Sequence, residues 1–578
     1  MMKKEAQKSD VLIIGSGGAG LRAAIELKDN GVDVLVVGKS KKRDAHTILA
    51  TGGINAALGN MDPKDSWRLH AADTIKDGAY INDPIAVKLL CKNAPRAIKE
   101  LADWGVKFHR EKDGSITQRF FGAATYRRAC FVGDHIGKEV LNILVDQAKK
   151  RKIRFKGEVY IFSLLHHKGK VNGAVGLDFR HGRVIVFHAK IVVLATGGHS
   201  RLFERSSSRF WENNGDGIQL AYDVGANFMD MEMFQFHPTG MVWPSEAVGT
   251  LVTEAVRGEG GILTNTKGER FMKKYDPKRM ELSTRDIVSR AIYTEVEEGR
   301  GTKLGGVWLD ITHRPKSYIL KRLPKMYKQF MHYLNVDISK QKMEVAPVAH
   351  YSMGGIFVDH TTGKTSVKNL FAIGEVTSGM HGGNRLGGNS LAETMVFGRL
   401  TGQRIVKELG RVRWLPLDEK LIKEKEEDLN SMLKAKKGKD PIKVKKEIQN
   451  IMWKDVGVVR NARGMKKALK AITKYRKVKL KSGNRLKNNQ KLIAALDVKN
   501  MFNSCEMIVK CARLRKESRA AHYRTDYKKT SEKWKKNIIC IPNKYGKGFK
   551  ITTWKVPEVP KEIKKLLKVK AVKVHLLE

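Results

Sequence analysis

A glycine-rich turn near the start of the chain constrains the fold more than any other feature. An apolar run over residues 11–14 leads into Gly15-Ser-Gly17-Gly18-Ala-Gly20, which has the G-x-G-x-x-G spacing, and an alanine-rich helical pattern follows. Gly15 lets the chain turn, Gly17 lets the backbone approach a pyrophosphate, and Gly20 lets helix and strand pack closely. The N-terminus of the helix then presents its positive end to the phosphates. The segment predicts a dinucleotide-binding α/β fold.

Two later strand ends favour FAD over NAD as the dinucleotide. The second predicted strand ends near Lys39 and lacks the acidic residue that usually holds an NAD ribose. One later apolar run ends in Thr196-Gly197, and another ends in Gly374-Glu375. Small residues there let backbone approach a ligand, and Glu375 is a candidate acceptor for ribityl hydroxyl groups. Together with the first turn they indicate an FAD domain interrupted by an insert.

The ends and apolar runs of the chain bear on its location. No apolar run approaches the roughly 18 residues that span a bilayer. The N-terminus enters the first strand almost at once, which leaves no room for a targeting segment. We therefore expect a cytoplasmic protein that is soluble or docks on something that spans the membrane.

Cysteine spacing limits where electrons can go after they leave the flavin. The five cysteines form no C-x-x-C or ferredoxin-like array, so we predict neither an iron–sulfur cluster nor another metal site in this chain. Electrons must then pass to oxygen, to a soluble acceptor or to another subunit.

The chain is strongly basic, with a formal net charge of +50, of which roughly +31 lies after residue 410. A solvated, lysine-rich helical face is the simplest interpretation, and attraction of a dicarboxylate, an acidic partner, a polyanion or anionic lipid is the alternative. No aromatic-basic module is present, so we do not expect nucleic-acid binding.

Five further motifs, in a fixed order, carry a family resemblance. They are Gln235-Phe-His237-Pro-Thr-Gly, Thr253-Glu254-Ala-Val-Arg257-Gly-Glu-Gly-Gly, Ser283-Thr-Arg285-Asp286, Ala349-His350-Tyr-Ser-Met-Gly-Gly and His381-Gly-Gly-Asn-Arg385-Leu-Gly-Gly-Asn-Ser390-Leu. With these motifs the chain resembles the flavoprotein subunit of succinate dehydrogenase and fumarate reductase, in the superfamily that includes L-aspartate oxidase. A weaker match, Glu517-Ser-Arg519-Ala-Ala-His522, lies near the C-terminus.

The family resemblance assigns a domain to each range of residues that the sequence patterns separate. The expected fold class is α/β, with a doubly wound, Rossmann-like FAD-binding domain over residues 1–236 and 346–410. The insert at 237–345 corresponds to an α+β capping domain. Charged helical patterns such as 417–433 and 442–453 fall in a helical domain at 411–504, and a small C-terminal domain follows at 505–578.

The resemblance also assigns roles to individual residues. Arg285 is implied to exchange a proton with the substrate carbanion, supplied through Glu254 and Arg257, while flavin N5 exchanges a hydride. Arg385 and His350 are implied to hold one substrate carboxylate, and His237 and Thr253 the other; an arginine clamps a carboxylate bidentately. The residues expected to contact FAD are Gly15, Gly17, Gly18, Gly20, Lys39, His46, Thr47, Gly52, Gly53, Thr196, Gly197, Asp216, Glu375, Asn389, Ser390 and Leu391.

His46 matches the residue that carries FAD through a covalent 8α-histidyl bond in membrane-linked members. The following Thr47 and Gly52-Gly53 fit the family pattern, whereas the usual Arg-Ser before the histidine is Asp44-Ala45 here. The departure leaves open whether the FAD is covalently attached or the histidine only packs against the flavin.

L-aspartate oxidase is the competing hypothesis. That enzyme carries an acidic residue before a glycine pair to hold the substrate ammonium, and this chain has phenylalanine in the corresponding stretch Arg119-Phe120-Phe121-Gly122. An unpaired ammonium in a closed site costs several kcal/mol, so aspartate should be rejected. The favoured function is interconversion of succinate and fumarate, with His46 favouring succinate oxidation. The partners that the resemblance implies are a membrane anchor and an iron–sulfur subunit, which would hold the chain on the cytoplasmic face of the membrane.

Overall fold

The fold centres on a seven-stranded sheet. A computed structural model describes residues 4–543 and 548–569. Five strands of the sheet pair in parallel, and two more join one edge through antiparallel pairing. The parallel strands are β6 (Arg154–Lys156), β2 (Val34–Val37), β1 (Lys4–Ile14), β9 (Arg183–Leu194) and β16 (Leu370–Ala372), and the antiparallel ones are β8 (Lys170–Asp178) and β7 (Val159–His167).

Register brings the ends of the parallel strands together. Ile14 of β1 lies opposite Val37 of β2 and Leu194 of β9, and Ala372 of β16 also lies opposite Leu194. The segments that follow these four residues therefore leave the sheet at the same edge. This is the carboxyl edge, where ligands bind in open parallel sheets.

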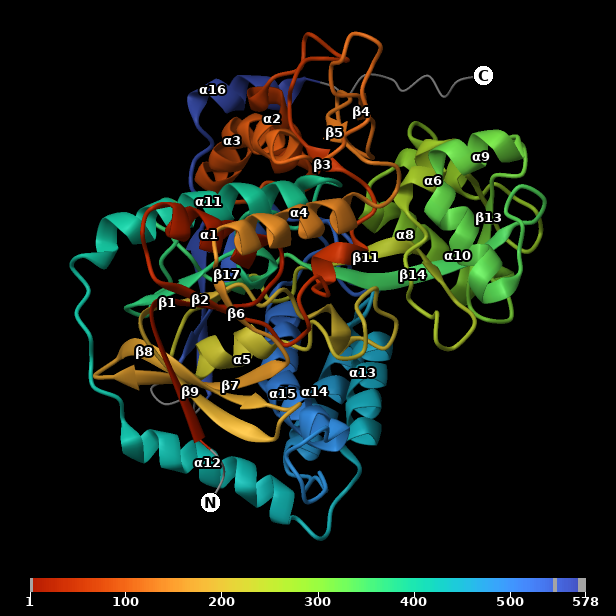
Figure 1. The fold of residues 1–578 in the computed structure, drawn as a ribbon. Helices are drawn as coiled ribbons and strands as arrows, with labels where there is room; N and C mark the ends of the chain where they lie inside the picture. Colours follow the sequence, from red (N-terminus) through yellow and green to blue (C-terminus); the bar gives the residue numbers. More distant parts are fainter. Residues whose placement is uncertain (1–3, 544–547, 570–578) are drawn as a thin grey trace.

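Helices cover both faces of the sheet, as its alternating side chains require. Val11 and Ile13 of β1 pack in one hydrophobic cluster with residues of α1 (Gly18–Asp29) and α11 (Asn389–Leu409). Leu12 and Ile14 point the other way, into a cluster with α5 (Asp216–Asp223) and α15 (Gln490–Leu514). Figure 1 shows α1, α4 (Ile136–Lys150) and α11 above β1 and β2, with α5 and α15 below them. The predicted doubly wound α/β class is confirmed.

The segment between β11 and β14 builds a second sheet with its own core. The strands run in the order β11 (Phe234–Met241), β14 (Met343–Ser352), β13 (Val307–Asp310), β12 (Ile262–Thr264). A separate hydrophobic cluster from Met241 to Val345 packs them against the helices of the segment. Those helices are α6 (Glu254–Gly258), α7 (Met272–Tyr275), α8 (Arg285–Glu295), α9 (Lys316–Arg322) and α10 (Pro324–Leu334).

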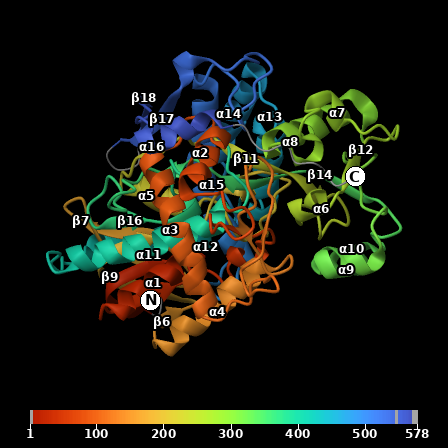
Figure 2. The same ribbon diagram turned by 90° about the horizontal axis from the view of Figure 1, so that it is seen from above.

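This second sheet and its helices stand to one side of the molecule in both ribbon views (Figures 1 and 2). The boundaries proposed for the capping domain, 236/237 and 345/346, fall inside β11 and β14. These two strands therefore carry the chain into the insert and back.

The helical patterns after residue 411 correspond to observed helices. Asp418, Asp440, Asn461 and Asn489 each accept a hydrogen bond from the first turn of a helix, which is the usual N-cap arrangement. The capped helices are α12 (Glu419–Lys434), α13 (Pro441–Val456), α14 (Ala462–Arg476) and α15.

The C-terminal segment is not separated from what precedes it. The boundary proposed between residues 504 and 505 falls inside α15, a continuous helix. β17 (Lys536–Pro542) pairs with β18 (Phe549–Lys555) and with β10 (Phe228–Met229), and β15 (Gly355–Ile356) completes that sheet. The segment up to residue 569 is thus joined to the FAD-binding part, and residues 570–578 lie outside the described residues.

The remaining elements flank the FAD-binding part. They are α2 (Trp67–Asp77), α3 (Pro84–Asp103), α16 (Lys561–Lys564) and a small sheet of β3 (Ile54–Asn55), β5 (Ala129–Cys130) and β4 (Gln118–Arg119). Among the helices in the described ranges 4–543 and 548–569, none is both long enough and apolar enough to cross a membrane.

A buried ion cluster joins α15 to the sheet. The Asp497 carboxylate, fully buried, accepts from Lys39 Nζ at 3.0 Å, Lys445 Nζ at 2.8 Å and the Tyr160 hydroxyl at 2.9 Å. Lys39 also pairs with Asp216 at 3.0 Å. One buried carboxylate therefore pairs with ammonium groups from two distant segments.

Removing the Asp497 carboxylate should lower the free energy of unfolding substantially. Asp497→Ala would leave the buried ammonium of Lys445 without its counterion, and breaking a buried pair costs roughly 3–5 kcal/mol. We expect a loss of this size in the free energy of unfolding, measured by urea denaturation. Asp428→Ala, which removes the exposed pair with Lys425, is the control and should cost under about 1 kcal/mol. Equal losses in the two variants would contradict the prediction.

Candidate active site

One cavity opens at the carboxyl edge of the large sheet and extends to the second sheet. It brings together nearly all of the residues that the sequence singled out. Those that line it are Gly15, Gly17, Gly18, Lys39, His46, Thr47, Gly52, Gly53, Thr196, Gly197, Asp216, His237, Thr253, Glu254, Arg285, His350, Glu375, Arg385, Ser390 and Leu391.

Three predicted residues do not line the cavity. Gly20 packs beneath it, where an added Cβ would lie 2.1 Å from the carbonyl oxygen of Gly15. The Asn389 side chain turns into the interior and bonds to Asn55 at 2.9 Å. Arg257 lies behind Glu254. A direct cofactor contact by the Asn389 side chain remains a prediction.

Two helix N-termini face the part of the cavity that fits a dinucleotide. α1 begins after Gly17, and its first amide, Gly18 N, donates to Thr47 Oγ1 at 3.0 Å. α11 begins after Gly388, and Ser390 and Leu391 in its first turn line the same cavity. Helix N-termini attract anions, which suits the pyrophosphate of FAD.

A buried hydroxyl also lacks a partner at this end of the cavity. Thr196 Oγ1 is buried and bonds to nothing among the described residues. The next residue must be glycine, because its φ is +73° and an added Cβ on Gly197 would lie 2.7 Å from Asn213 Oδ1. An unpartnered polar atom beside a cavity fits a polar cofactor.

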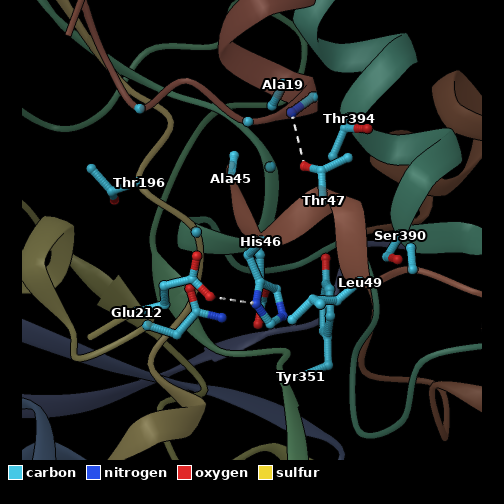
Figure 3. A pocket seen from close by; sticks show the side chains of 18 of the residues that line it. Ala19, Ala45, His46, Thr47, Leu49, Thr196, Glu212, Tyr351, Ser390 and Thr394 are labelled. Carbon is cyan, nitrogen blue, oxygen red and sulfur yellow. Dashed lines mark hydrogen bonds and ion pairs between the residues drawn. The ribbon is translucent and has the colours of Figure 1, made fainter. Parts of the chain in front are cut away.

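His46 projects into the cavity from a short 3-10 helix, His46–Leu49, and faces Glu212. Its Nδ1 lies 3.3 Å from Glu212 Oε2. Figure 3 marks this contact with a dashed line. Arg209 bonds Glu212 Oε2 at 2.8 Å and Asp44 Oδ1 at 2.6 Å. The unexpected Asp44 before the histidine is thus neutralised by an arginine from elsewhere in the chain.

The ionisation of this pair follows from its surroundings. Burial lowers the pKa of His46, but the hydrogen bond and charge of Glu212 outweigh it, so the pKa lies above its ordinary value. Burial raises the pKa of Glu212, but His46 and Arg209 outweigh it and hold that pKa at about 2. Glu212 is therefore an anion that orients the imidazole through Nδ1 and leaves Nε2 for a ligand.

At the other end of the cavity, His237, His350 and Arg385 line the wall together. Arg385 stacks on the Tyr351 ring at 4.3 Å, and its Nε is buried without a partner in the described part of the chain. His350 Nδ1 bonds Ser207 Oγ at 2.9 Å. The His237 and His350 rings lie 5.3 Å apart, edge to face. These groups converge on one small space.

Burial makes this end of the cavity a site for an anion. Burial, with the charge of Arg285 second, lowers the pKa of Arg385 to about 10, so it remains a cation at neutral pH. Burial and nearby arginines place the pKa values of His237 and His350 well below their ordinary value, so both rings are neutral. An anion would compensate the buried guanidinium, which is costly to desolvate alone.

Arg285 and Glu254 form the tightest pair beside this space. Arg285 Nε and Nη2 lie 2.9 Å and 2.8 Å from Glu254 Oε2, and Gly122 N donates to Glu254 Oε1 at 2.9 Å. Arg257 Nη2 is farther, at 3.9 Å. Burial raises the pKa of Glu254, but Arg285 and Arg257 outweigh it and hold the pKa at about 2. The carboxylate therefore stands between two guanidinium groups, in the order expected from the sequence.

Phe121, which the family resemblance sets against the acidic residue of aspartate oxidase, forms part of the cavity wall. Its ring lies against the backbone, since an added Cβ on Gly52 would meet Phe121 Cζ at 2.5 Å and one on Gly387 would meet Cδ2 at 3.3 Å. A phenylalanine ring at this position provides neither the negative charge nor the hydrogen-bond acceptor that a buried ammonium group needs.

Comparisons with known proteins agree with this geometry. Residues 10–391 match the model of the FAD binding domain, and residues 445–574 match the model described as fumarate reductase flavoprotein C-term. The chain is 42% identical over 548 residues to a fumarate reductase (CoM/CoB) subunit from Methanothermobacter marburgensis, which covers 93% of this chain and 98% of the relative. The chain belongs to the succinate dehydrogenase and fumarate reductase flavoprotein family.

Further members of the family match over most of their length. The succinate dehydrogenase flavoprotein subunit of Rickettsia bellii is 35% identical over 571 residues, covering 93% of this chain and 94% of the relative. A solved structure of quinol fumarate reductase from E. coli superposes with a TM-score of 0.89 at 30% identity, covering 97% of this chain and 99% of that one. The chain is thus a flavoprotein oxidoreductase, and the predicted FAD cofactor is confirmed.

Sequence reasoning missed some residues of the site. Gln235 and Asn384 lie inside the family motifs but had no role assigned, although Gln235 Oε1 accepts from Arg285 Nη1 at 2.9 Å. Glu212 and Arg209 gave no signal at all, because nothing in a linear sequence places them beside His46. For Gln235, its position two residues before His237 in a family motif was the available signal.

The pairing of Glu212 with His46 can be measured by titration. In Glu212→Gln the pKa of His46 should fall, because burial then acts without the opposing charge. Histidine-selective NMR follows the titration, and Glu204→Gln, an exposed glutamate of the same segment, is the control. Because the folded-state pKa is raised, the pair stabilises the protein fully below pH 6.5 and less as pH rises through that pKa. An unchanged titration in Glu212→Gln would exclude the contact.

Proposed function

We propose that this chain interconverts succinate and fumarate at its bound FAD. The substrate lies where the cavity meets the second sheet, with one carboxylate held by Arg385 and His350 and the other by His237 and Thr253. Bound FAD supplies hydride exchange at N5. The chain supplies binding, water exclusion and a proton.

The observation that carries the proposal is the convergence of positive and neutral donor groups on one buried space. Arg385 keeps a buried, unpartnered Nε in the described part of the chain, and His237 and His350 lie within 5.3 Å of each other, centroid to centroid. A small dianion suits such a set better than a neutral or cationic substrate, because it compensates the buried guanidinium groups.

Arg285 is the proposed proton donor to the substrate carbon in fumarate reduction and the acceptor in succinate oxidation. Arginine is a weak acid, so the donor must be recharged promptly. Glu254, which is 5% exposed and bridges toward Arg257, is the proposed route for that proton. Once Arg285 has given its proton to the substrate carbon it is neutral, and Glu254 can then pass a proton from Arg257 to it. The carboxylate therefore keeps one cationic neighbour throughout the transfer.

The direction of catalysis depends on the electron partner. His46 and Gly52-Gly53-Ile54 favour succinate oxidation, whereas the name of the Methanothermobacter relative favours fumarate reduction. We therefore propose that the site runs in both directions and that the partner decides between them. The proposed partners are a membrane anchor and an iron–sulfur subunit, which would place the chain at the cytoplasmic face of the membrane.

L-aspartate oxidation remains the alternative to be excluded. Phe121 occupies the position expected to pair with the substrate ammonium, and its ring is buried at the cavity wall. We therefore expect turnover of succinate or fumarate with an artificial electron carrier and no turnover of L-aspartate. Aspartate turnover would overturn the proposal.

The proposed role of Arg285 is tested by Arg285→Lys. A lysine keeps the charge but not the bidentate geometry, so we expect kcat to fall by roughly 10²–10⁴-fold in fumarate reduction with viologen as donor. FAD content, read from flavin absorbance, should stay at the wild-type level. Arg300→Lys, which alters another ion-paired arginine of the insert outside the cavity wall, is the matched control. Activity close to wild type in Arg285→Lys would show that Arg285 does not transfer the proton.

Covalent attachment of FAD through His46 is a separate proposal. Glu212 holds Nδ1 of the imidazole, which leaves Nε2 free to bind the cofactor. Acid precipitation of the purified protein should give a pellet with flavin fluorescence, and His46→Ser should release the FAD to the supernatant. Wild-type protein whose flavin is entirely acid-soluble would instead show that His46 only packs against it.

A further inference from the structure

A chain of side-chain hydrogen bonds leads away from Arg285 on the side opposite Glu254. Arg285 Nη1 donates to Gln235 Oε1 at 2.9 Å, and Gln235 Nε2 donates to Asn384 Oδ1 at 2.8 Å. Asn384 Nδ2 donates in turn to Asp77 Oδ1 at 3.0 Å and to Asp286 Oδ1 at 3.4 Å. All of these bonds point the same way, from a cation to a pair of carboxyl groups, so each polarises the next.

The chain of bonds ends on two acids that share one amide nitrogen. Asp286 also pairs with Arg290 Nη1 at 2.9 Å, which stabilises its charge. Asp77 accepts from Asn384, and burial, followed by the charge of Asp286, raises its pKa to about 7. Two carboxylates so close do not both ionise readily, and a pKa of about 7 means that Asp77 gains and loses its proton around neutral pH.

We propose that Gln235 and Asn384 are positioning residues that hold the guanidinium of Arg285 and make its placement depend on the charge state of the Asp77–Asp286 acid pair. The proposal rests on the proposed function, because it concerns the arginine assigned to proton transfer there. Neither amide has a substrate contact in that proposed function. Their effect passes through Arg285.

The linked groups come from four separate parts of the fold. Gln235 lies on β11, Asn384 precedes α11, Asp77 ends α2, and Arg285 with Asp286 begins α8. The chain of bonds therefore fixes the first turn of α8, which belongs to the insert, against the FAD-binding part.

A second contact holds α8 from the C-terminal segment. Arg290 Nη1 donates to the carbonyl oxygen of Ala520 at 2.8 Å, and its guanidinium stacks on Tyr523 at 5.1 Å. This contact involves no titratable carboxyl group other than Asp286.

The charged groups around Asp77 set the sign of the expected pH effect. Asp286 and Arg285 face it from α8, and Glu254 faces it from α6. Lys76, its neighbour on α2, is engaged with Asp73 at 3.0 Å. Ionisation of Asp77 adds a negative charge that repels Asp286 and Glu254 and pulls on Arg285.

Arg519 is the charged side chain that contacts the backbone just after Asp77. It donates to the carbonyl oxygen of Ala79 at 2.9 Å and pairs with Glu517. It is already neutralised there. The raised pKa of Asp77 therefore means that docking of α8 is strongest while Asp77 is protonated and weakens as pH rises through about 7.

The decisive experiment compares pH profiles of fumarate reduction by the FAD-loaded protein. The kcat/KM of wild type should drop by about tenfold between pH 6 and pH 8.5 beyond the drop seen in Asp77→Asn. Asp223→Asn is the control: it removes another acid whose pKa is raised, to about 6, and which lies on α5 outside the cavity wall. It should keep the wild-type profile.

A second measurement does not depend on turnover. The infrared difference spectrum between wild type and Asp77→Asn should contain a protonated carboxyl band that titrates near pH 7, whereas bands from other acids with a raised pKa, such as Glu375 and Asp230, cancel in the difference. Gln235→Met should lower kcat by about 10–100-fold with FAD retained, whereas Gln235→Asn, which keeps the amide, should recover part of it.

The outcomes separate the two proposals. No fumarate turnover by wild type overturns the proposed function, while the infrared band still tests the acid pair. Turnover with identical pH profiles in wild type, Asp77→Asn and Asp223→Asn overturns this inference and leaves the function standing. Wild-type kcat in Gln235→Met overturns the positioning role in the same way.

Discussion

The parallel pairing of β1 with β2 and β9, and of β9 with β16, is the constraint on which the site depends. Because Ile14, Val37, Leu194 and Ala372 are in register, the glycine-rich segments after them emerge at one edge. Two helix N-termini then face the same cavity, and they attract the phosphates of FAD. A shift of one strand would scatter these segments.

Buried charge governs the other half of the site. Arg285, Arg257 and Arg385 are all largely buried, and isolated guanidinium groups are expensive to desolvate. Glu254 pairs with the first two and compensates one of their two positive charges, and the third keeps an unpartnered Nε in the described part of the chain. The protein thereby holds uncompensated positive charge, which a dicarboxylate would neutralise. A related arrangement occurs at Asp497, where one buried carboxylate pairs with Lys445 and Lys39, and Asp216 provides the second negative charge.

Local patterns predicted elements well where capping and periodicity agree. The helical patterns at 417–433 and 442–453 correspond to α12 (Glu419–Lys434) and α13 (Pro441–Val456), whose starts are fixed by Asp418 and Asp440. The end of the helical region was predicted less well, because α15 continues through residue 505 without any glycine or proline to stop it. Pairing of β17 with β10 joins residues too far apart in the chain for any local pattern to reveal.

The amino-acid sequence alone determined the cofactor class, the order of the motifs and the identity of the groups suited to a dianion, because these depend on residue type and spacing. Only the tertiary structure decided which of those groups meet. It set Arg209 and Glu212 beside His46, and it joined Arg285 through Gln235 to a pair of acids. The reason is physical: hydrogen bonds and ion pairs act over about 3 Å in space, and the residues that they join here lie up to hundreds of positions apart.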